Sequence, residues 1–237
     1  TPVALSSLNG DLSAFNVIII PDANAGTLGK GAGLKSWVER GGTLITMGSA
    51  TSWAAREDVA MTTARILTGD DAKDEKKKDE AKDEKPKPDA KEEKPKAEAA
   101  PPAATDTLLA VKSPTANPNA PQPVPGSHFD AVLDMTHWLT LGVEKQRTTV
   151  MFEGDAFLKL SKEGSNVAVF PTTGLLRRAG FVFPDNTERL LKGTALLVEE
   201  TVGRGHLVMF ANDPMFRGWW RALDRLVMNA VLLGPTF

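Results

Sequence analysis

Apolar residues follow two kinds of pattern in the first part of this chain, and together they predict an α/β fold. Val17–Ile20 and Thr43–Met47 are short, nearly continuous apolar runs, as expected of strands that are covered on both faces. A glycine-rich turn and a predicted helix at Leu34–Arg40 separate the two runs, and a glycine pair ends that helix. A further helix is predicted near Ser52–Leu67. This strand–helix–strand–helix order predicts a parallel sheet with right-handed crossovers.

The second half of the chain reads as shorter strands followed by a helix. Thr194–Val202 and His206–Ala211 are expected to pair as a hairpin around Gly203–Gly205. Apolar residues at three- and four-residue spacing predict one long amphipathic helix within Met215–Leu233. Further short elements are predicted as strands at Phe129–Met135, Thr148–Phe152, Ala156–Leu160 and Val167–Phe170, and as a helical turn at Asn186–Leu191.

A charged and proline-rich stretch separates these two halves. From Asp70 to Glu98 there are 12 acidic residues and 10 lysines, and seven prolines follow between Pro101 and Pro125. Such a stretch buries too little apolar surface to offset the entropy lost on ordering, so we predict a disordered insertion at 70–126. A solvated polyampholyte is the favoured interpretation; a lysine-rich docking tail and an isolated charged helix are the alternatives. The expected organisation is one domain in two parts, residues 1–69 and 127–237.

Composition excludes several classes of function. The formal net charge is −2, so no overall field attracts nucleic acid or a membrane surface. Cysteine is absent, which removes disulfides, thiolate metal ligands and a cysteine nucleophile. No apolar run reaches the length of a membrane span. The chain opens at Thr1 without an initiator Met or signal peptide, and we expect it to be a piece of a longer polypeptide.

Polar residues follow three of the predicted strands and form the default pocket. The turns Asp22–Gly26, Gly48–Thr51 and Asn212–Arg217 each come after the carboxyl end of a strand, where open α/β sheets place their ligands. The candidate ligand-binding residues are Asp22, Asn24, Ser49, Thr51, Asn212, Asp213 and Arg217.

Ser49 lies where a nucleophile elbow would place its serine, but the Gly-x-Ser-x-Gly pattern is incomplete. A serine nucleophile needs a base that is itself held by a third group. The three histidines are His128, His137 and His206, and His206 is expected at the opposite edge of the sheet. A turn or helix-cap role is therefore favoured for Ser49, with a nucleophile as the fallback.

The remaining candidates also have structural explanations. Asp213-Pro214 fits the N-cap and first position of a helix, and capping is favoured over a ligand or catalytic role. Arg217, one turn into that helix, is expected either to hold an anion or to pair with a carboxylate. No histidine belongs to a His-x-x-Glu motif, so we predict no metal site in this chain. The glycines near Gly29 match neither a dinucleotide fingerprint nor a P-loop.

Three segments carry a family resemblance. Asn16–Asp22 followed by Leu34–Ile45 resembles class I glutamine amidotransferase-like domains in its order of strand, proline, helix, glycine pair and strand. Asp134–Gly142 resembles the Asp-x-x-His-Pro-Leu-x-x-Gly segment of that group, with Trp138 in place of the proline. Gly203–Gly205 with Phe210–Arg217 and Asn229–Pro235 resembles the tail of these domains where they follow a zinc carboxypeptidase of the carboxypeptidase A type in secreted bacterial enzymes.

The resemblance implies a flavodoxin-like, amidotransferase-like three-layer sandwich with a mostly parallel sheet. It also implies that the family's first strand and helix lie upstream. An active amidotransferase uses a cysteine at the elbow; here that position falls on or beside Ser49. We therefore expect a degenerate, non-catalytic accessory domain of a secreted or periplasmic zinc carboxypeptidase. Its partner is the upstream peptidase domain, zinc is expected only there, and this chain carries no cofactor. A Ser49-dependent hydrolase is the alternative, and homo-oligomerisation stays open.

Overall fold

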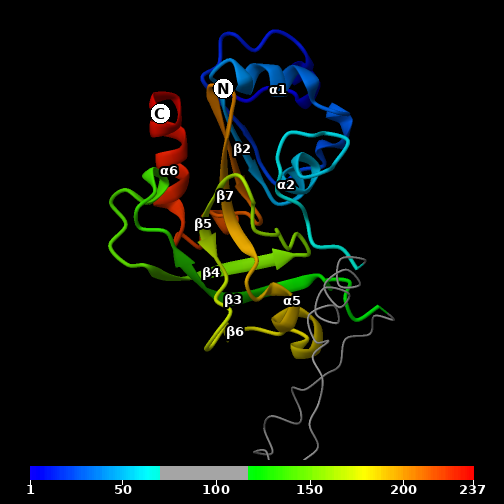
Figure 1. The fold of residues 1–237 in the computed structure, drawn as a ribbon, viewed down its shortest axis with the longest axis vertical. Helices are drawn as coiled ribbons and strands as arrows, with labels where there is room; N and C mark the ends of the chain where they lie inside the picture. Colours follow the sequence, from blue (N-terminus) through cyan, green and yellow to red (C-terminus); the bar gives the residue numbers. More distant parts are fainter. Residues whose placement is uncertain (70–116) are drawn as a thin grey trace, which may run out of the picture.

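The computed structural model describes residues 1–69 and 117–237 of the chain (Figure 1). Most of the predicted insertion, residues 70–116, lies outside the described residues. The predicted insertion was expected to end at residue 126, but residues 117–126 are described and β3 already begins at Val124. Asn186 bonds to the backbone of this segment at Pro118, Ala120 and Gln122.

The predicted order of elements is present in the first half. Strand β1 spans Val17–Ile20 and β2 spans Thr43–Met47, with helix α1 at Ala32–Glu39 between them. Helix α2 is shorter than predicted and covers Ser49–Ala54. Short 3-10 helices precede β1 and α1, as η1 at Leu5–Asn9 and η2 at Ala25–Leu28.

The chain after α2 is irregular where a helix was predicted to continue to Leu67. Ala60 has a positive φ of 51°, which a continuing helix does not allow. A buried carboxylate holds this segment instead: the oxygens of Glu200 accept from the N–H of Thr63, the hydroxyl of Thr63 and the N–H of Ala64. Contacts with a strand distant in sequence therefore override the local helical pattern.

The second half is built mainly of strands. They are β3 at Val124–Leu133, β4 at Arg147–Gly154, β5 at Ser165–Val169, β6 at Arg177–Ala179, β7 at Ala195–Val202 and β8 at Gly205–Phe210. The short helical elements are η3 at Trp138–Thr140, the π-helical turn η4 at Pro184–Glu188, α5 at Arg189–Leu191, η5 at Phe216–Gly218 and η6 at Gly234–Thr236. The predicted strand at Ala156–Leu160 is reduced to isolated bridges at Leu158.

One mixed sheet joins the two halves in the order β1-β2-β8-β7-β5-β3-β4, with β6 paired to β3. The α/β class is confirmed, and β1, β2 and β8 are parallel. The other pairings are antiparallel, so the parallel arrangement is confined to those three strands. Antiparallel pairing arises in the second half because tight connections such as the β7–β8 turn can join only antiparallel strands, whereas parallel neighbours need a long crossover.

Helices cover both sides of the parallel strands. In Figure 1, α1 and α2 lie on one side of β2, and the C-terminal helix α6 lies on the other. Helix α6 spans only Asp224–Leu233, so the predicted start near Met215 is wrong. Arg217 and Gly218 both have positive φ, 54° and 66°, and they end the helical pattern before α6.

The core runs along the centre of the sheet. Every residue of β2 and β8 is buried, because these strands are covered on both faces. Leu226, Val227 and Ala230 form a buried stripe on α6, as the apolar spacing predicts, and Leu223 just before the helix is buried as well. No helix in residues 1–69 or 117–237 combines the length and apolar character needed to cross a bilayer.

Candidate functional site

The predicted pocket centres on a strand–turn–helix elbow between β2 and α2. Gly48 forms its vertex, with φ 53° and ψ −118°, and its N–H bonds to the carbonyl oxygen of Phe210 at 3.1 Å. In a nucleophile elbow the nucleophile occupies this strained turn residue, and the next N–H helps to bind the oxyanion. The vertex therefore falls on a residue without a side chain, one position before Ser49.

Asp22 fills the space in front of the vertex. A Cβ atom placed on Gly48 would lie 2.6 Å from Cγ of Asp22, a separation that real Cβ atoms do not show. The Ser49 N–H, which is the donor that would meet an oxyanion, bonds to Oδ1 of Asp22 at 2.9 Å. The protein's own carboxylate thus occupies both the side-chain space and the N–H group of the elbow.

In the described part of the chain, no histidine bonds to the Ser49 hydroxyl, and Asp22 bonds only to its backbone N–H. Its neighbour Thr51 is buried and donates its hydroxyl to the Phe210 carbonyl at 2.7 Å. His206 lies beside Thr43 at the opposite end of β2. At about 3.3 Å per residue, β2 alone places about 13 Å between Thr43 and Met47, well beyond hydrogen-bond reach.

The other predicted residues serve local structure. The side chain of Asn24 accepts from the Gly26 N–H at 3.0 Å and caps η2. Asp213 likewise accepts from the Met215 N–H at 2.9 Å, but no α-helix follows this turn, so the predicted N-cap of a long helix is wrong. Asn212 points toward the far edge of the sheet and donates to the Met151 carbonyl at 2.8 Å.

Arg217 lies in the short 3-10 element η5 with a non-helical backbone, and not in the first turn of an α-helix. Its guanidinium lies 5.1 Å from the ring centroid of Phe216, and its own backbone has positive φ. The helix-based anion site predicted for this residue is therefore not formed. Among the predicted residues, only Asp22 and Ser49 are brought into direct contact by a hydrogen bond.

A charged cluster that the sequence did not single out lies at the opposite end of β8. Glu199 of β7 is 5% exposed and receives one histidine on each carboxylate oxygen. Its Oε1 lies 2.7 Å from Nδ1 of His206, and its Oε2 lies 3.4 Å from Nε2 of His137. The signal in the sequence was two adjacent acidic residues inside an otherwise apolar strand.

Hydrogen bonds define which nitrogen of His137 carries a proton and keep Glu199 charged. Nδ1 of His137 accepts from the Leu139 N–H at 3.2 Å, so Nε2 carries the proton that faces Glu199. Burial acts to raise the pKa of Glu199, but the hydrogen bonds from His137 and His206 outweigh it and lower that pKa to about 2. Glu199 is therefore a buried carboxylate held in its charged form.

Aromatic rings cover this cluster. Trp138 packs against His206 with ring centroids 5.6 Å apart, and Phe237 stacks on Trp138 at 5.4 Å. The side-chain hydrogen bond of His206 runs through Nδ1 to Glu199. A carboxylate-oriented imidazole of this kind is half of a catalytic pair, but no hydroxyl of the described residues bonds to it.

Metal binding finds no support in the described residues. Residues 1–69 and 117–237 contain no group of three or more histidine, cysteine, aspartate or glutamate side chains that could hold an ion. Glu199 uses both oxygens on its two histidines. In this cluster the two histidines and Glu199 satisfy one another's buried polar groups. That zinc belongs to an upstream domain stays a prediction.

The neighbouring residue, Glu200, faces a different set of partners. Its Oε1 accepts from the Ser161 hydroxyl at 2.6 Å and from the Thr63 hydroxyl at 2.7 Å. Burial acts to raise the pKa of Glu200, and these hydrogen bonds lower it more. Glu199 and Glu200 thus anchor segments that are far apart in sequence.

Comparison with known proteins reveals only distant similarity. No family model and no curated protein matches the chain. A cytoplasmic protein of Salmonella typhimurium is 13% identical, with a TM-score of 0.46, and the match covers 98% of this chain and 75% of that one. A second cytoplasmic protein, of Salmonella typhimurium LT2, is 16% identical with a TM-score of 0.42, covering 98% and 76%.

A β-galactosidase from Bacillus circulans sp. alkalophilus is also similar, at 13% identity and a TM-score of 0.41. The match covers 96% of this chain but spans only 23% of the β-galactosidase.

Proposed function

We propose that this chain is a non-catalytic accessory domain with a degenerate, amidotransferase-like elbow. In this proposal it adopts the three-layer arrangement of class I glutamine amidotransferase-like domains and serves a zinc carboxypeptidase of the same secreted or periplasmic polypeptide. The observation that carries the proposal is the position of Asp22. Its carboxylate fills the space in front of Gly48 and occupies the N–H of Ser49.

Each requirement of nucleophilic catalysis is unmet at this elbow. The strained vertex has no side chain, because it is a glycine. The donor for an oxyanion is already paired with a carboxylate, which would also repel a second negative charge. General-base assistance is worth about 10²–10⁴-fold in rate, and His206 lies at the other end of β2.

The alternative is a hydrolase that uses Ser49. Ser49 is exposed, but exposure alone does not activate a hydroxyl, and no observation in the described residues favours this alternative. The polar groups at this edge instead fix the turn that joins β2 to α2. The proposal therefore assigns the chain a structural or interaction role, and the upstream peptidase as its partner is part of the same proposal.

Covalent labelling tests the non-catalytic part of the proposal. A fluorophosphonate probe reacts with activated serines, so we expect no saturable labelling of the wild-type chain. Ser49→Ala serves as the matched control. Labelling that appears in the wild type and disappears in Ser49→Ala would favour the hydrolase.

The peptidase context has a separate test. In the full polypeptide, the proposal expects an upstream His-x-x-Glu motif with a distant third histidine. It also expects one zinc ion per chain, which is lost when that motif is substituted and kept when residues 1–237 are deleted. A polypeptide without such a motif would refute the peptidase assignment and leave the labelling result unaffected.

A further inference from the structure

One ring nitrogen of His137 caps a helical element. His137 precedes η3, and its Nδ1 accepts a hydrogen bond from the Leu139 N–H at 3.2 Å. The other ring nitrogen, Nε2, faces a carboxylate oxygen of Glu199 at 3.4 Å. A neutral imidazole has one acceptor nitrogen and one donor nitrogen, so both nitrogens of His137 are in use.

A second proton on this ring would remove the cap. An imidazolium carries a proton on each nitrogen and accepts no hydrogen bond. Protonation of His137 at Nδ1 would therefore set its new N–H against the N–H of Leu139. The contact of Nε2 with Glu199 does not depend on that proton, because Glu199 stays charged, with a pKa of about 2.

Protons can reach His137 while the chain is folded. Its side chain is 10% exposed, whereas Leu139 beside it is fully buried. Histidine is the side chain whose charge ordinarily changes between pH 5 and 8. The ring of His137 can thus gain a proton without prior opening of the core.

The ionisable groups around His137 come from the sheet and from its own loop. Glu199 lies on β7 and bonds to His206 of β8 at 2.7 Å. Asp134 lies in the loop before η3, and its pKa is lowered first by the hydroxyl and the N–H of Thr136 and least by the charge of His137. The proton on His137 therefore acts within a small set of charges.

The segment that His137 caps also attaches to α6. The side-chain amide of Asn229 donates to the carbonyl of Leu139 at 2.8 Å and to that of Leu141 at 2.9 Å. The charged side chain that α6 places beside this loop is Arg225, whose guanidinium lies next to Gly142. A change at the cap consequently acts on a segment that joins the sheet to α6.

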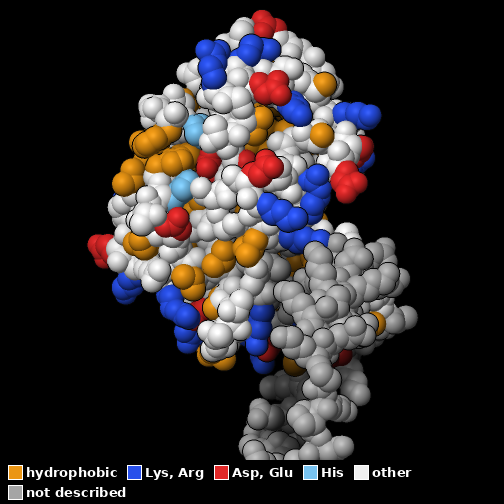
Figure 2. Space-filling model, viewed as in Figure 1, with side chains coloured by type: hydrophobic (Ala, Val, Ile, Leu, Met, Phe, Trp, Pro, Cys, Tyr) orange, Lys and Arg blue, Asp and Glu red, His pale blue; other side chains and the backbone are white. Residues whose placement is uncertain are grey.

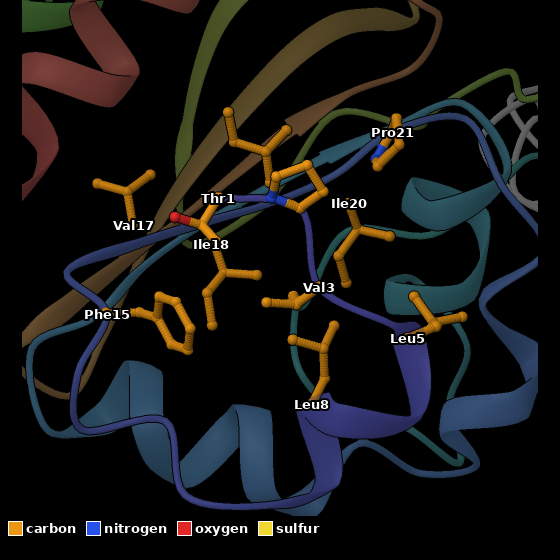
Figure 3. A pocket seen from close by; sticks show the side chains of 11 residues that line it. Thr1, Val3, Leu5, Leu8, Phe15, Val17, Ile18, Ile20 and Pro21 are labelled. Carbon is orange, nitrogen blue, oxygen red and sulfur yellow. The ribbon is translucent and has the colours of Figure 1, made fainter.

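The apolar groove beside β1 is lined by side chains that do not ionise. Figure 3 shows Val3, Leu8, Phe15 and Ile18 among them. A change of pH has no side chain to act on in that groove. A pH-sensitive contact is expected at the Glu199 cluster instead.

We propose that His137 is a pH-sensitive cap of η3. The neutral ring closes the first turn of η3, and protonation at Nδ1 in mild acid opens it. The open form frees the Leu139 N–H and loosens Trp138, which packs against His206 with ring centroids 5.6 Å apart. The proposal does not rest on the proposed function, because it concerns the opposite end of the strands.

Nuclear magnetic resonance tests the proposal on the whole chain without any substitution. Nitrogen-15-labelled residues 1–237 are titrated from pH 8 to pH 5, and the ring nitrogens and backbone amides are followed. We expect Nδ1 of His137 to be unprotonated at pH 8 and to gain a proton in acid, with the Leu139 amide signal shifting at the same midpoint. A proton on Nδ1 at pH 8, an Nδ1 still unprotonated at pH 5, or a Leu139 amide that does not respond would each overturn the proposal.

Amide hydrogen exchange gives the size of the effect. After correction for the intrinsic pH dependence of exchange, opening of the Leu139 amide should be about fivefold more frequent at pH 5 than at pH 8. This factor corresponds to the roughly 1 kcal/mol that one N-cap contributes. The amides of β2 are the reference and should not change, because this strand is paired on both sides. An equal increase in β2 would indicate general unfolding and contradict a local cap.

Two substitutions separate His137 from its neighbour. His137→Asn keeps an acceptor suited to an N-cap but does not titrate, so Leu139 should be equally protected at both pH values. His206→Gln keeps a donor for Glu199 and removes the other titrating ring, and the response of Leu139 should persist. A response that survives in His137→Asn, or disappears in His206→Gln, would overturn the assignment to His137. If either variant fails to fold, the ring-nitrogen titration of the wild type still decides.

Discussion

The two ends of the parallel strands use their polar residues in opposite ways. At the carboxyl end, Asp22 and Ser49 are exposed, and one hydrogen bond joins them. At the amino end of β8, Glu199 and His206 are buried and paired beneath aromatic rings. Figure 2 shows histidine side chains surfacing beside an apolar area over α6, on the side of the molecule away from α2.

This comparison shows that the position of polar residues at the end of a sheet does not decide whether they form a reactive site. The carboxyl edge of an α/β sheet is where ligands ordinarily bind, yet its residues here hold the turn in shape. The buried cluster around Glu199 lies at the other end of these strands, where the rule does not point, and it joins the η3 segment to β7 and β8. Polar residues at the carboxyl edge of a sheet therefore do not by themselves make a catalytic site, which also needs a nucleophile, a base and an oxyanion donor in contact.

The largest expected effect is the loss of the buried carboxylate. Glu199→Ala leaves two histidine N–H groups without their acceptor, and breaking a buried pair costs about 3–5 kcal/mol. Urea denaturation should show this drop in the free energy of unfolding. Glu163→Ala, an exposed glutamate, should change that free energy by at most about 0.5 kcal/mol. Equal effects would mean that the cluster does not stabilise the fold.

Acid should weaken the same cluster. The pKa of Glu199 falls from 4.5 to about 2 on folding. A carboxyl with a lowered folded pKa stabilises the protein above its unfolded pKa, and this contribution is lost as pH falls from 4.5 toward 2. At about 1.4 kcal/mol per unit the loss is at most about 3 kcal/mol. The free energy of unfolding, measured by urea denaturation at several pH values, should fall less steeply from pH 4.5 to 2 in Glu199→Gln than in the wild type.

At the other end, Gly48→Ala tests the closed elbow. Its Cβ would collide with Asp22, and alanine is disfavoured at φ 53°. We expect a loss of about 1–3 kcal/mol. Asp22→Gly in the same chain should recover part of the loss by removing the collision. A double-mutant cycle measures this coupling, and strict additivity would show that Asp22 does not fill the elbow.

The smallest effect belongs to the exposed hydrogen bond itself. Asp22→Ala should cost about 1 kcal/mol, because water can replace the carboxylate on the Ser49 N–H. Asp22→Asn keeps an acceptor oxygen and should cost less. Thermal unfolding resolves the two variants if the contact contributes as described.

The sequence predicted correctly those strands and turns whose conformation depends mainly on neighbouring residues. Val17–Ile20 and Thr43–Met47 are strands with the predicted bounds, because continuous β-branched and apolar runs suit a covered strand. The β7–β8 hairpin was likewise predicted by its glycine turn. The helix predicted at Ser52–Leu67 failed because Glu200, from a distant strand, holds Thr63 and Ala64 in another conformation.

The candidate site divides in the same way. The contact between Asp22 and Ser49 follows from the adjacency of β1 and β2, which the strand order predicts. The vertex at Gly48 depends on backbone angles, which residue types did not reveal. The Glu199 cluster requires the register of β7 on β8 and the place of η3, so three scattered histidines gave no sign of it.

Turnover by the purified chain tests the central claim most directly. Wild type and Ser49→Ala should be assayed side by side with glutamine, ester and carboxypeptidase substrates, with and without added zinc. The closed elbow predicts no turnover above background in either protein. Turnover in the wild type that vanishes in Ser49→Ala would contradict the account and establish Ser49 as a nucleophile.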